Sequence, residues 1–198
     1  GTIRAVDNLG NPVPLTYPDP KRPQNTKSIV SETTFWDARE ERWVQSLDIN
    51  LANMVESGIK PANGILYVST EDSNGNMGVV RLKNGSRLPA SQITGGFTVA
   101  TDDPIYIQGD FNTVNKTLAM VAADSLNILS NAWNDANSNK TMSTYRKASQ
   151  TTVNAVCISG IVPSKNNHYS GGVENYFRFL EYWTGVDFNF SGSIIQMW

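Results

Sequence analysis

The stretch Gly96–Asn112, GFTVATDDPIYIQGDFN, decides the fold that the sequence predicts. It holds two short runs of residues that favour β-strands, Phe97–Ala100 and Ile105–Gln108, separated only by TDDP. Pro104 has no N–H group and cannot donate a ladder hydrogen bond at its own position. A link of this kind lets the chain turn a corner and continue. We therefore interpret the two runs as successive turns of a parallel coil, and not as the two arms of a hairpin.

Similar short runs recur from Gly64 to the end of the chain, with turn-forming residues between them. The further runs are Ile65–Ser69, Val79–Leu82, Leu118–Ala122, Leu126–Leu129, Val153–Val162 and Phe188–Met197. Near-continuous apolar sequence of this kind is typical of strands that are buried on both sides. We expect the asparagines inside these runs, Asn127 and Asn154, to point inward and form amide ladders. The predicted fold class is mainly β, an irregular right-handed β-helix or solenoid with a few short helices, one of which covers an end or flank.

Two segments have competing interpretations. An Asn-Gly pair lies between Ile65–Ser69 and Val79–Leu82, and this is a strong hairpin signal, so these two runs are a hairpin candidate. The segment Leu118–Ser130 also fits an amphipathic helix, because apolar residues recur along one face at helical spacing.

Two helices are predicted from periodicity. The first covers about residues 48–57, with Asp48 or Asn50 near its N-cap and Gly58 as its stop. The second covers Val173 to Trp183, where Val173, Phe177 and Leu180 recur at helical spacing. We expect this second helix to pack its aromatic face over the open end or flank of the β-coil.

The chain divides into three expected parts. Residues 1–30 form an extended Pro-rich segment, because proline fixes φ and removes backbone donors. Residues 31–63 form an N-terminal strand and helix segment that packs on the next part, and residues 64–198 form the β-solenoid domain. The first residues, GTIRAV, lack an initiator methionine, so we expect the chain to be processed or cut from a longer precursor.

Composition limits the classes of partner. The net charge is −2 and there is no dense basic block, which argues against nucleic acid as a partner. No apolar run is long enough to predict a membrane span in this chain. The single cysteine, Cys157, lies in an apolar run, and we expect it to be buried and unreactive.

The sequence offers few groups for catalysis. His168 is the only histidine and lies in a loop, and no G-x-S-x-G motif supplies a nucleophilic serine. Adjacent Asp102 and Asp103 point to opposite sides of an extended chain and cannot readily share one substrate. The further carboxylate groups are Glu71 with Asp72, and Asp37 with Glu40 and Glu41. The DSNGN segment lacks the glutamate that completes a calcium loop, so a tight turn is the preferred interpretation. We therefore predict no catalytic, cofactor-binding or metal-binding residues, no cofactor, and no enzyme.

Several stretches, taken in order, carry a family resemblance. They are FWDAREERWVQSLDINLANM, NGILYVST, GFTVATDDPIYIQGDFNT, AMVAADSLNILSNAW, TTVNAVCISGIV and YSGGVENYFRFLEYWTGVDFNFSGSIIQMW. Over roughly residues 30–198 the chain resembles the extracytoplasmic C-terminal region of large bacterial envelope proteins related to type IV pilus assembly components. The resemblance implies an irregular β-solenoid, an extracellular or periplasmic location in the outer envelope, and no catalytic motif. The prepilin-like membrane helix of those proteins is not in this sequence, and they usually run on past the position of Trp198, so we expect a fragment.

These observations lead to one main functional hypothesis and two rivals. The main hypothesis is a non-enzymatic structural or adhesive module of the bacterial envelope, accessory to pilus-like machinery. Its expected partners are other envelope or pilus-like proteins, including further copies of itself. The rival hypotheses are a carbohydrate-active β-helix protein, either a polysaccharide lyase or a module that binds surface polysaccharide, and a subunit of an extracellular filament.

Overall fold

The computed structural model describes residues 2–161 and 176–197. The helical elements are α1 (Leu51–Ser57), the 3₁₀ turn η1 (Asp135–Asn137) and α2 (Met142–Tyr145). In chain order the strands are β1 (Thr16–Asp19), β2 (Arg22–Ser28), β3 (Val30–Asp37), β4 (Arg42–Asn50), β5 (Ile65–Val68), β6 (Met77–Lys83), β7 (Gly96–Thr101), β8 (Ile105–Gln108), β9 (Leu118–Ala122), β10 (Leu126–Leu129), β11 (Thr151–Ser159), β12 (Arg178–Phe179) and β13 (Phe188–Gln196).

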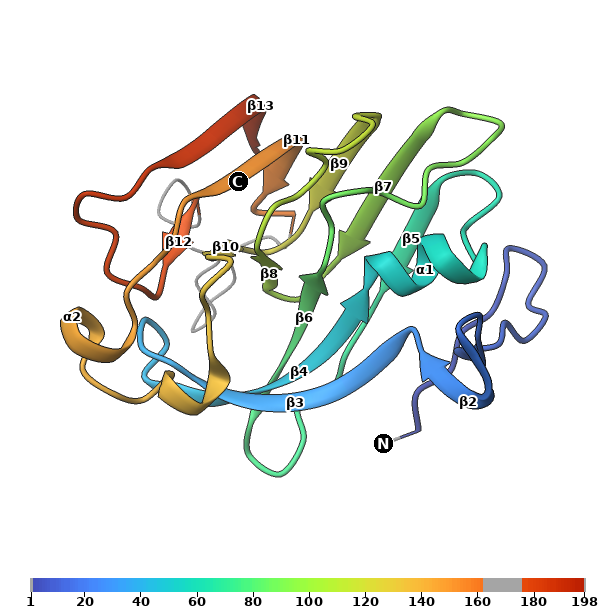
Figure 1. Ribbon diagram of the computed structural model, residues 1–198. Helices are drawn as coiled ribbons and strands as arrows, with labels where there is room; N and C mark the ends of the chain where they lie inside the picture. Colours follow the sequence, from blue (N-terminus) through green and yellow to red (C-terminus); the bar gives the residue numbers. More distant parts are fainter. Residues whose placement is uncertain (1, 162–175, 198) are drawn as a thin grey trace.

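The strands form three sheets (Figure 1). A two-stranded antiparallel sheet, β1-β2, lies near the N-terminus. A six-stranded sheet has the order β12-β10-β8-β6-β4-β3, and a five-stranded sheet has the order β13-β11-β9-β7-β5. From β4 onward, successive strands therefore belong alternately to the six-stranded and the five-stranded sheet. All described pairings among these strands are parallel, whereas β3 pairs with β4 antiparallel.

The main hydrophobic core lies between the two large sheets. Alternate residues of a strand point to opposite faces, and in β7 the side chains of Phe97 and Val99 point into this core. On the facing sheet, β8 contributes Ile105 and Ile107. Leu51 of α1 is buried in the same cluster, so this helix covers part of the core near β4 and β6.

Helix α1 confirms the first helix prediction. Its N-cap is Asn50, whose side chain accepts a hydrogen bond from the Asn53 N–H at 3.2 Å. Gly58 follows the helix with φ of 74°, a left-handed conformation that glycine adopts at little cost. The local capping signals were therefore sufficient to place this element.

A second cluster lies on the other face of the six-stranded sheet. Phe35, Val44, Val79 and Tyr106 point to this face, opposite to their core-facing neighbours in the same strands. The connection between β10 and β11, which carries η1 and α2, packs over them through Trp133. The outer face of the six-stranded sheet is consequently covered by protein.

The predicted fold class is corrected by this architecture. The described residues combine a mixed sheet, a parallel sheet, an antiparallel hairpin and two short α-helices, in place of an irregular right-handed β-helix or solenoid. The recurring apolar runs are not equivalent turns of one coil, although their sequences look alike. The antiparallel pairing of β3 with β4 was not predicted, because Phe35–Val44 mixes aromatic and charged residues without a clean period.

The predicted C-terminal helix is wrong in its described part. Val173 lies outside the described residues, and Tyr176–Trp183 holds a bend, strand β12 and a loop. Phe177 has φ of 21° and so does not have a helical backbone. Arg178 and Phe179 pair with Asn127 and Ile128 of β10, and this tertiary pairing overrides the helical spacing of the apolar residues.

The strand pairings also decide how the short apolar runs are connected. Strands β7 and β8 belong to different sheets, so the prediction that they are not a hairpin is confirmed. Strands β5 and β6 are also in different sheets, so the hairpin candidate is wrong. The segment Leu118–Ser130 forms β9 and β10, and its interpretation as a helix is wrong.

The predicted ladder of Asn127 and Asn154 does not form. Both residues are buried, but they lie in different sheets, and each lies on the face of its sheet opposite to the main core.

Candidate functional site

The outer face of the five-stranded sheet is the best candidate for a functional surface. It presents the side chains that alternate with the core residues of β5, β7, β9, β11 and β13. Three large apolar side chains on it are largely exposed: Leu118 at 75%, Tyr67 at 64% and Ile65 at 53%. In contrast to the six-stranded sheet, this sheet leaves its outer face open in the described part of the chain. We call this surface the open face.

The open face has no charged residue in any of its strands. The strand sequences ILYV, GFTVAT, LAMVA, TTVNAVCIS and FNFSGSIIQ contain no Asp, Glu, Lys or Arg. Strands β2, β3, β4, β6 and β12 of the other sheets contain charged side chains, whereas β8 and β10 lack charge but are almost entirely buried. Solvent-exposed sheet faces are usually polar. Burial in the core therefore does not explain why the exposed strands of this face have no charged residues.

Strand register aligns the outward side chains in rows across the sheet. One row runs through Ile65, Thr98, Met120, Val156 and Ser193. Thr98 and Ser193 in this row have short side chains, which leave room beside the longer side chains of Met120 and of Leu118 in the neighbouring row. The face is accordingly hollowed there.

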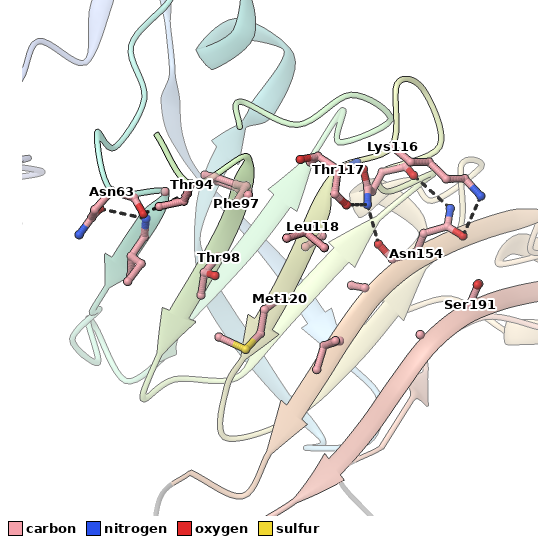
Figure 2. A pocket seen from close by; sticks show the side chains of 18 residues that line it. Asn63, Thr94, Phe97, Thr98, Lys116, Thr117, Leu118, Met120, Asn154 and Ser191 are labelled. Carbon is pink, nitrogen blue, oxygen red and sulfur yellow. Dashed lines mark hydrogen bonds between the residues drawn. The ribbon is translucent and has the colours of Figure 1, made fainter. Parts of the chain in front are cut away.

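A groove of about 590 Å³ crosses the open face and involves all five strands (Figure 2). Its polar lining is mostly neutral, and Lys116 is the charged residue among the residues that line it. The polar side chains are Asn63, Thr94, Thr98, Asn112, Lys116, Thr117, Asn154 and Ser191, and the larger apolar side chains on this face are Ile65, Leu118, Met120 and Val156. An uncharged surface with a few amides and hydroxyls is suited to a neutral, partly apolar ligand.

A network of asparagine amides fixes one side of the groove. Asn112 donates from Nδ2 to the Asn154 carbonyl at 3.0 Å, and Asn154 returns a hydrogen bond to the Asn112 carbonyl at 3.1 Å. The Asn112 side-chain oxygen accepts from the Thr117 N–H at 3.0 Å. Lys116 Nζ donates to Asn154 Oδ1 at 3.3 Å, as Figure 2 shows. These contacts hold the loop before β9 against β11, so this rim of the groove is preorganised.

Carboxylates lie close to the end of the open face where β5 and β7 end. Tyr67 donates from its hydroxyl to Asp102 Oδ1 at 3.2 Å. Burial raises the pKa of Tyr67, and the hydrogen bond to Asp102 adds to that shift. Asp103 Oδ2 accepts from the Thr70 N–H at 2.7 Å, and burial raises the pKa of this carboxyl. The two neighbouring aspartates therefore bind different partners, as their adjacency predicted.

The other carboxylate groups take part in structural contacts. Asp37 accepts from the N–H groups of Arg39 and Glu40 and from the buried hydroxyl of Tyr106. Glu40 pairs with Arg178 of β12. Both contacts tie the β3–β4 turn to the six-stranded sheet.

The segment Asp72–Asn76 is a tight turn, as predicted. Ser73 and Asn76 exchange backbone hydrogen bonds at 3.0 and 2.9 Å, and both central residues, Asn74 and Gly75, have positive φ. Asp72 accepts from the Gly78 N–H at 3.0 Å. In the part of the chain that the structure describes, no three His, Cys, Asp or Glu side chains come together as metal ligands could.

Cys157 confirms the prediction of a buried thiol. Its side chain lies in the main core, and burial raises its pKa to about 12. The thiolate is the reactive form of cysteine, so this environment disfavours reaction at neutral pH. His168 lies outside the described residues.

Sequence reasoning missed two features. One is the buried ion network of Arg81 with Asp48 and Asp135, which links β6, β4 and the β10–β11 connection. Nothing local in the sequence marks these residues as partners. The other is the open face, which missing charge alone does not mark, because the runs of β8 and β10 in the six-stranded sheet also lack charged residues.

Within residues 2–161 and 176–197, no helix is long and apolar enough to cross a membrane. In comparisons with known proteins, no family model, no curated protein and no solved structure matches the chain.

Proposed function

We propose that this chain is a non-enzymatic binding module, structural or adhesive, that docks another protein on the open face. The observation that carries the proposal is the combination of large exposed apolar side chains with the absence of charge from all five strands. The centres of protein interfaces are depleted of charged residues in the same way. Contiguous exposed apolar patches on soluble proteins commonly mark interaction sites.

The groove supports docking more than catalysis. Lys116 is the one charged residue among its described lining, and it is hydrogen-bonded to Asn154. General acid–base chemistry needs a titratable pair within reach of a substrate, and nucleophilic catalysis needs an activated nucleophile. The amides and hydroxyls along the groove are suited to orienting a partner by hydrogen bonds.

The class of partner follows from the sequence resemblance. If the chain is part of an envelope protein related to pilus assembly components, its partners are other envelope or pilus-like proteins outside the cytoplasm. The module then serves as an accessory to pilus-like machinery. This assignment of place and partner rests on the quoted sequence stretches and goes beyond the geometry of the open face.

A double variant of the open face tests the proposal. Leu118→Lys with Met120→Lys places two charges on the outward side of β9, where the wild-type strand has none. Ile93→Lys is the control, because Ile93 is 82% exposed and does not line the groove. Binding to bacterial envelope fractions and to purified pilus-like fibres is measured by co-sedimentation with increasing amounts of each protein.

The expected result is saturable binding of the wild type and of the control, and at least a tenfold weaker binding of the double variant. Circular dichroism checks that all three proteins are folded. Equal binding of the three folded proteins, or no binding by any of them, would contradict the proposal.

A polysaccharide ligand is the second candidate, and one observation favours it. Tyr67 is an exposed aromatic ring on the open face, and its hydroxyl is hydrogen-bonded to Asp102. An aromatic face beside a carboxylate suits a sugar ring with its hydroxyl groups. Binding to a panel of surface polysaccharides that is lost in Tyr67→Ala would favour this candidate, and any turnover of a polysaccharide would overturn the non-enzymatic proposal.

A further inference from the structure

Strand β13 is the edge of the five-stranded sheet and is unusually exposed along its length. Among the described strands it pairs only with β11, and Figure 1 shows it at the outer side of that sheet. Five consecutive residues, Ser191–Ile195, are exposed. Successive side chains of a strand point to opposite faces, so exposure of five in a row means that both faces of this part are uncovered. None of their register partners in β11, Asn154–Ile158, is exposed.

The sequence of β13 lacks the features that protect sheet edges. Natural edge strands are commonly short or carry lysine, proline or inward-pointing charges, which oppose pairing with another chain. Strand β13 is nine residues long, and its sequence FNFSGSIIQ has no charge and no proline. The exposed side chains include Ile194 at 48% and Ile195 at 44%.

The backbone direction of β13 identifies which groups point outward. The Met197 N–H donates to the Ser159 carbonyl at 3.1 Å, and the Asp187 carbonyl accepts from the Thr151 N–H at 3.3 Å. Odd-numbered residues therefore point their N–H and C=O groups toward β11. Because the direction alternates along a strand, the backbone groups of the even-numbered residues, among them Phe188, Phe190, Gly192 and Ile194, point away from β11.

We propose that β13 pairs antiparallel with β13 of a second copy of this chain, about a twofold axis at Ser193. In antiparallel pairing, directly opposite residues share a face and share the direction of their hydrogen bonds. An axis at Ser193 places Gly192 opposite the partner's Ile194. It also places Phe190 opposite the partner's Gln196. The outward backbone groups of Gly192 and Ile194 are then used in hydrogen-bonded pairs, and Phe188 lies beyond the paired segment.

Side-chain size agrees with this register. Ile194 faces the partner's Gly192, which has no side chain, so a large residue lies opposite the smallest one. Ser193 faces the partner's Ser193, and Ser191 faces the partner's Ile195. No pair brings like charges together, because the strand has none.

The competing partner for this edge is β5, the other edge of the same sheet. Pairing of β13 with the partner's β5 would be heterologous and would generate a ring or an open filament. Strand β5 has four residues and β13 has nine, so that contact leaves much of β13 unpaired. The twofold pairing spans Phe190–Gln196, seven of the nine residues of β13, on both sides and closes as a dimer. This inference is independent of the proposed docking function of the open face.

Cysteine cross-linking tests the register directly. The pair at the axis is a non-hydrogen-bonded pair, with a Cα–Cα distance of about 4.5 Å, within the range of roughly 4.4–6.8 Å that a disulfide requires. Ser193→Cys is therefore expected to form a disulfide-linked dimer under mild oxidation. Ser191→Cys is the matched control, because it is also exposed on the same face of β13. In the dimer its two copies lie about 13 Å apart, a distance that four strand residues span.

The native thiol does not interfere, because Cys157 is the one cysteine and is buried. Non-reducing electrophoresis is expected to show at least ten times more cross-linked dimer for Ser193→Cys than for Ser191→Cys at equal protein concentration. Labelling of both folded variants with a thiol reagent checks that the two introduced thiols are equally accessible. Equal cross-linking of the two variants, or none in either, would overturn the proposal.

Light scattering of the protein without introduced cysteines provides a second measurement. The wild type is expected to shift from monomer to dimer as its concentration rises, and Ser193→Lys is expected to stay monomeric because two like charges would meet at the axis. A wild type that remains monomeric at all concentrations, or that forms an open series of larger species, would also overturn the proposal.

Discussion

Arg81 is fully buried in β6 and is held by two carboxylates on different elements. Its Nε and Nη2 donate to Asp48 of β4 at 2.8 and 2.6 Å, and its Nη1 donates to Asp135 of η1 at 2.6 Å. Asp48 lies directly opposite Arg81 in the β4–β6 register. The guanidinium also lies 4.9 Å from the centre of the Phe35 ring. One side chain thus joins two neighbouring strands to the connection that covers them.

Replacing Arg81 by methionine is expected to lower the free energy of unfolding by about 3–5 kcal/mol, because it leaves the buried Asp48 carboxylate without its main partner. Lys27→Met is the control, since Lys27 and Glu56 form an ion pair at 2.7 Å at the surface. Surface pairs contribute little because water screens them. Urea unfolding of both variants is the measurement, and similar losses in the two would contradict the assignment of Arg81 as a buried structural charge.

Asp135 provides a pH test of the same network. Burial raises the pKa of Asp135, but the hydrogen bond and charge of Arg81, with the Trp133 N–H, outweigh it, so the pKa lies below its usual 3.8. A lowered carboxyl pKa stabilises the fold above the unfolded-state value, and the contribution is lost as pH falls through the folded-state value. The difference in melting temperature between wild type and Asp135→Asn is therefore expected to be largest near neutral pH and to shrink below about pH 4. A difference that stays constant down to about pH 3 would refute this.

At the scale of single elements, local capping signals and tertiary pairings contribute differently. Helix α1 is set by residues next to it in the sequence, namely the N-cap Asn50 and the left-handed Gly58. Strand β12 is set by a neighbour distant in sequence, because Arg178 and Phe179 pair with β10. Sequence patterns therefore predict elements that are set by neighbouring residues well, and elements that are set by pairing with a distant strand poorly.

Asn50→Ala is expected to lower the stability of the protein by about 1 kcal/mol, because the Asn53 N–H loses its side-chain acceptor. Asn50→Asp keeps an acceptor at the same position and is expected to stay close to the wild type. Thermal unfolding of the two variants distinguishes them. If both lose the same amount of stability, the cap does not act through this hydrogen bond.

The limits of prediction follow from these physical causes. The position of α1, the tight turn at Asn74–Gly75 and the buried Cys157 depend on local conformation or local hydrophobicity, and the sequence predicted all three. The spacing of Phe177 and Leu180 is helical, yet Phe177 packs against Phe188 and Phe190 of β13, at ring distances of 5.2 and 4.8 Å. Contacts between distant segments decided that region, and a single sequence does not reveal them. The absence of charge did not identify the open face either, because β8 and β10 of the other sheet lack charged residues as well.

At the scale of the whole molecule, the two large sheets differ in how their outer faces are used. The outer face of the six-stranded sheet is covered by the β10–β11 connection through Trp133 and Asp135, with Ser138 accepting from the Trp36 N–H at 2.9 Å. The outer face of the five-stranded sheet leaves Leu118, the first residue of the central strand β9, exposed. The core therefore buries one side of the five-stranded sheet, and the other side is exposed in the described part of the chain.

Two substitutions compare how much the core and the open face contribute to the free energy of unfolding. Ile107→Ala removes a buried core side chain of β8 and is expected to cost about 2–5 kcal/mol. Leu118→Ala removes an exposed side chain of the open face and is expected to change stability by less than about 0.5 kcal/mol. Guanidinium unfolding of the two variants is the measurement. A loss in Leu118→Ala that approaches the loss in Ile107→Ala would mean that the face is needed for folding.

The absence of charge from the open face also has a kinetic consequence. Long-range electrostatic attraction, which speeds many associations, can act here only through charges beside the strands, such as Lys116 at the rim and Asp102 near Tyr67. Under the proposed docking function, we expect a partner to reach this face by largely unsteered collision, with an association rate of the order of 10⁵–10⁶ M⁻¹ s⁻¹. Once formed, a contact without ion pairs is not weakened by salt screening. We therefore expect its affinity to be about the same at low and at high ionic strength.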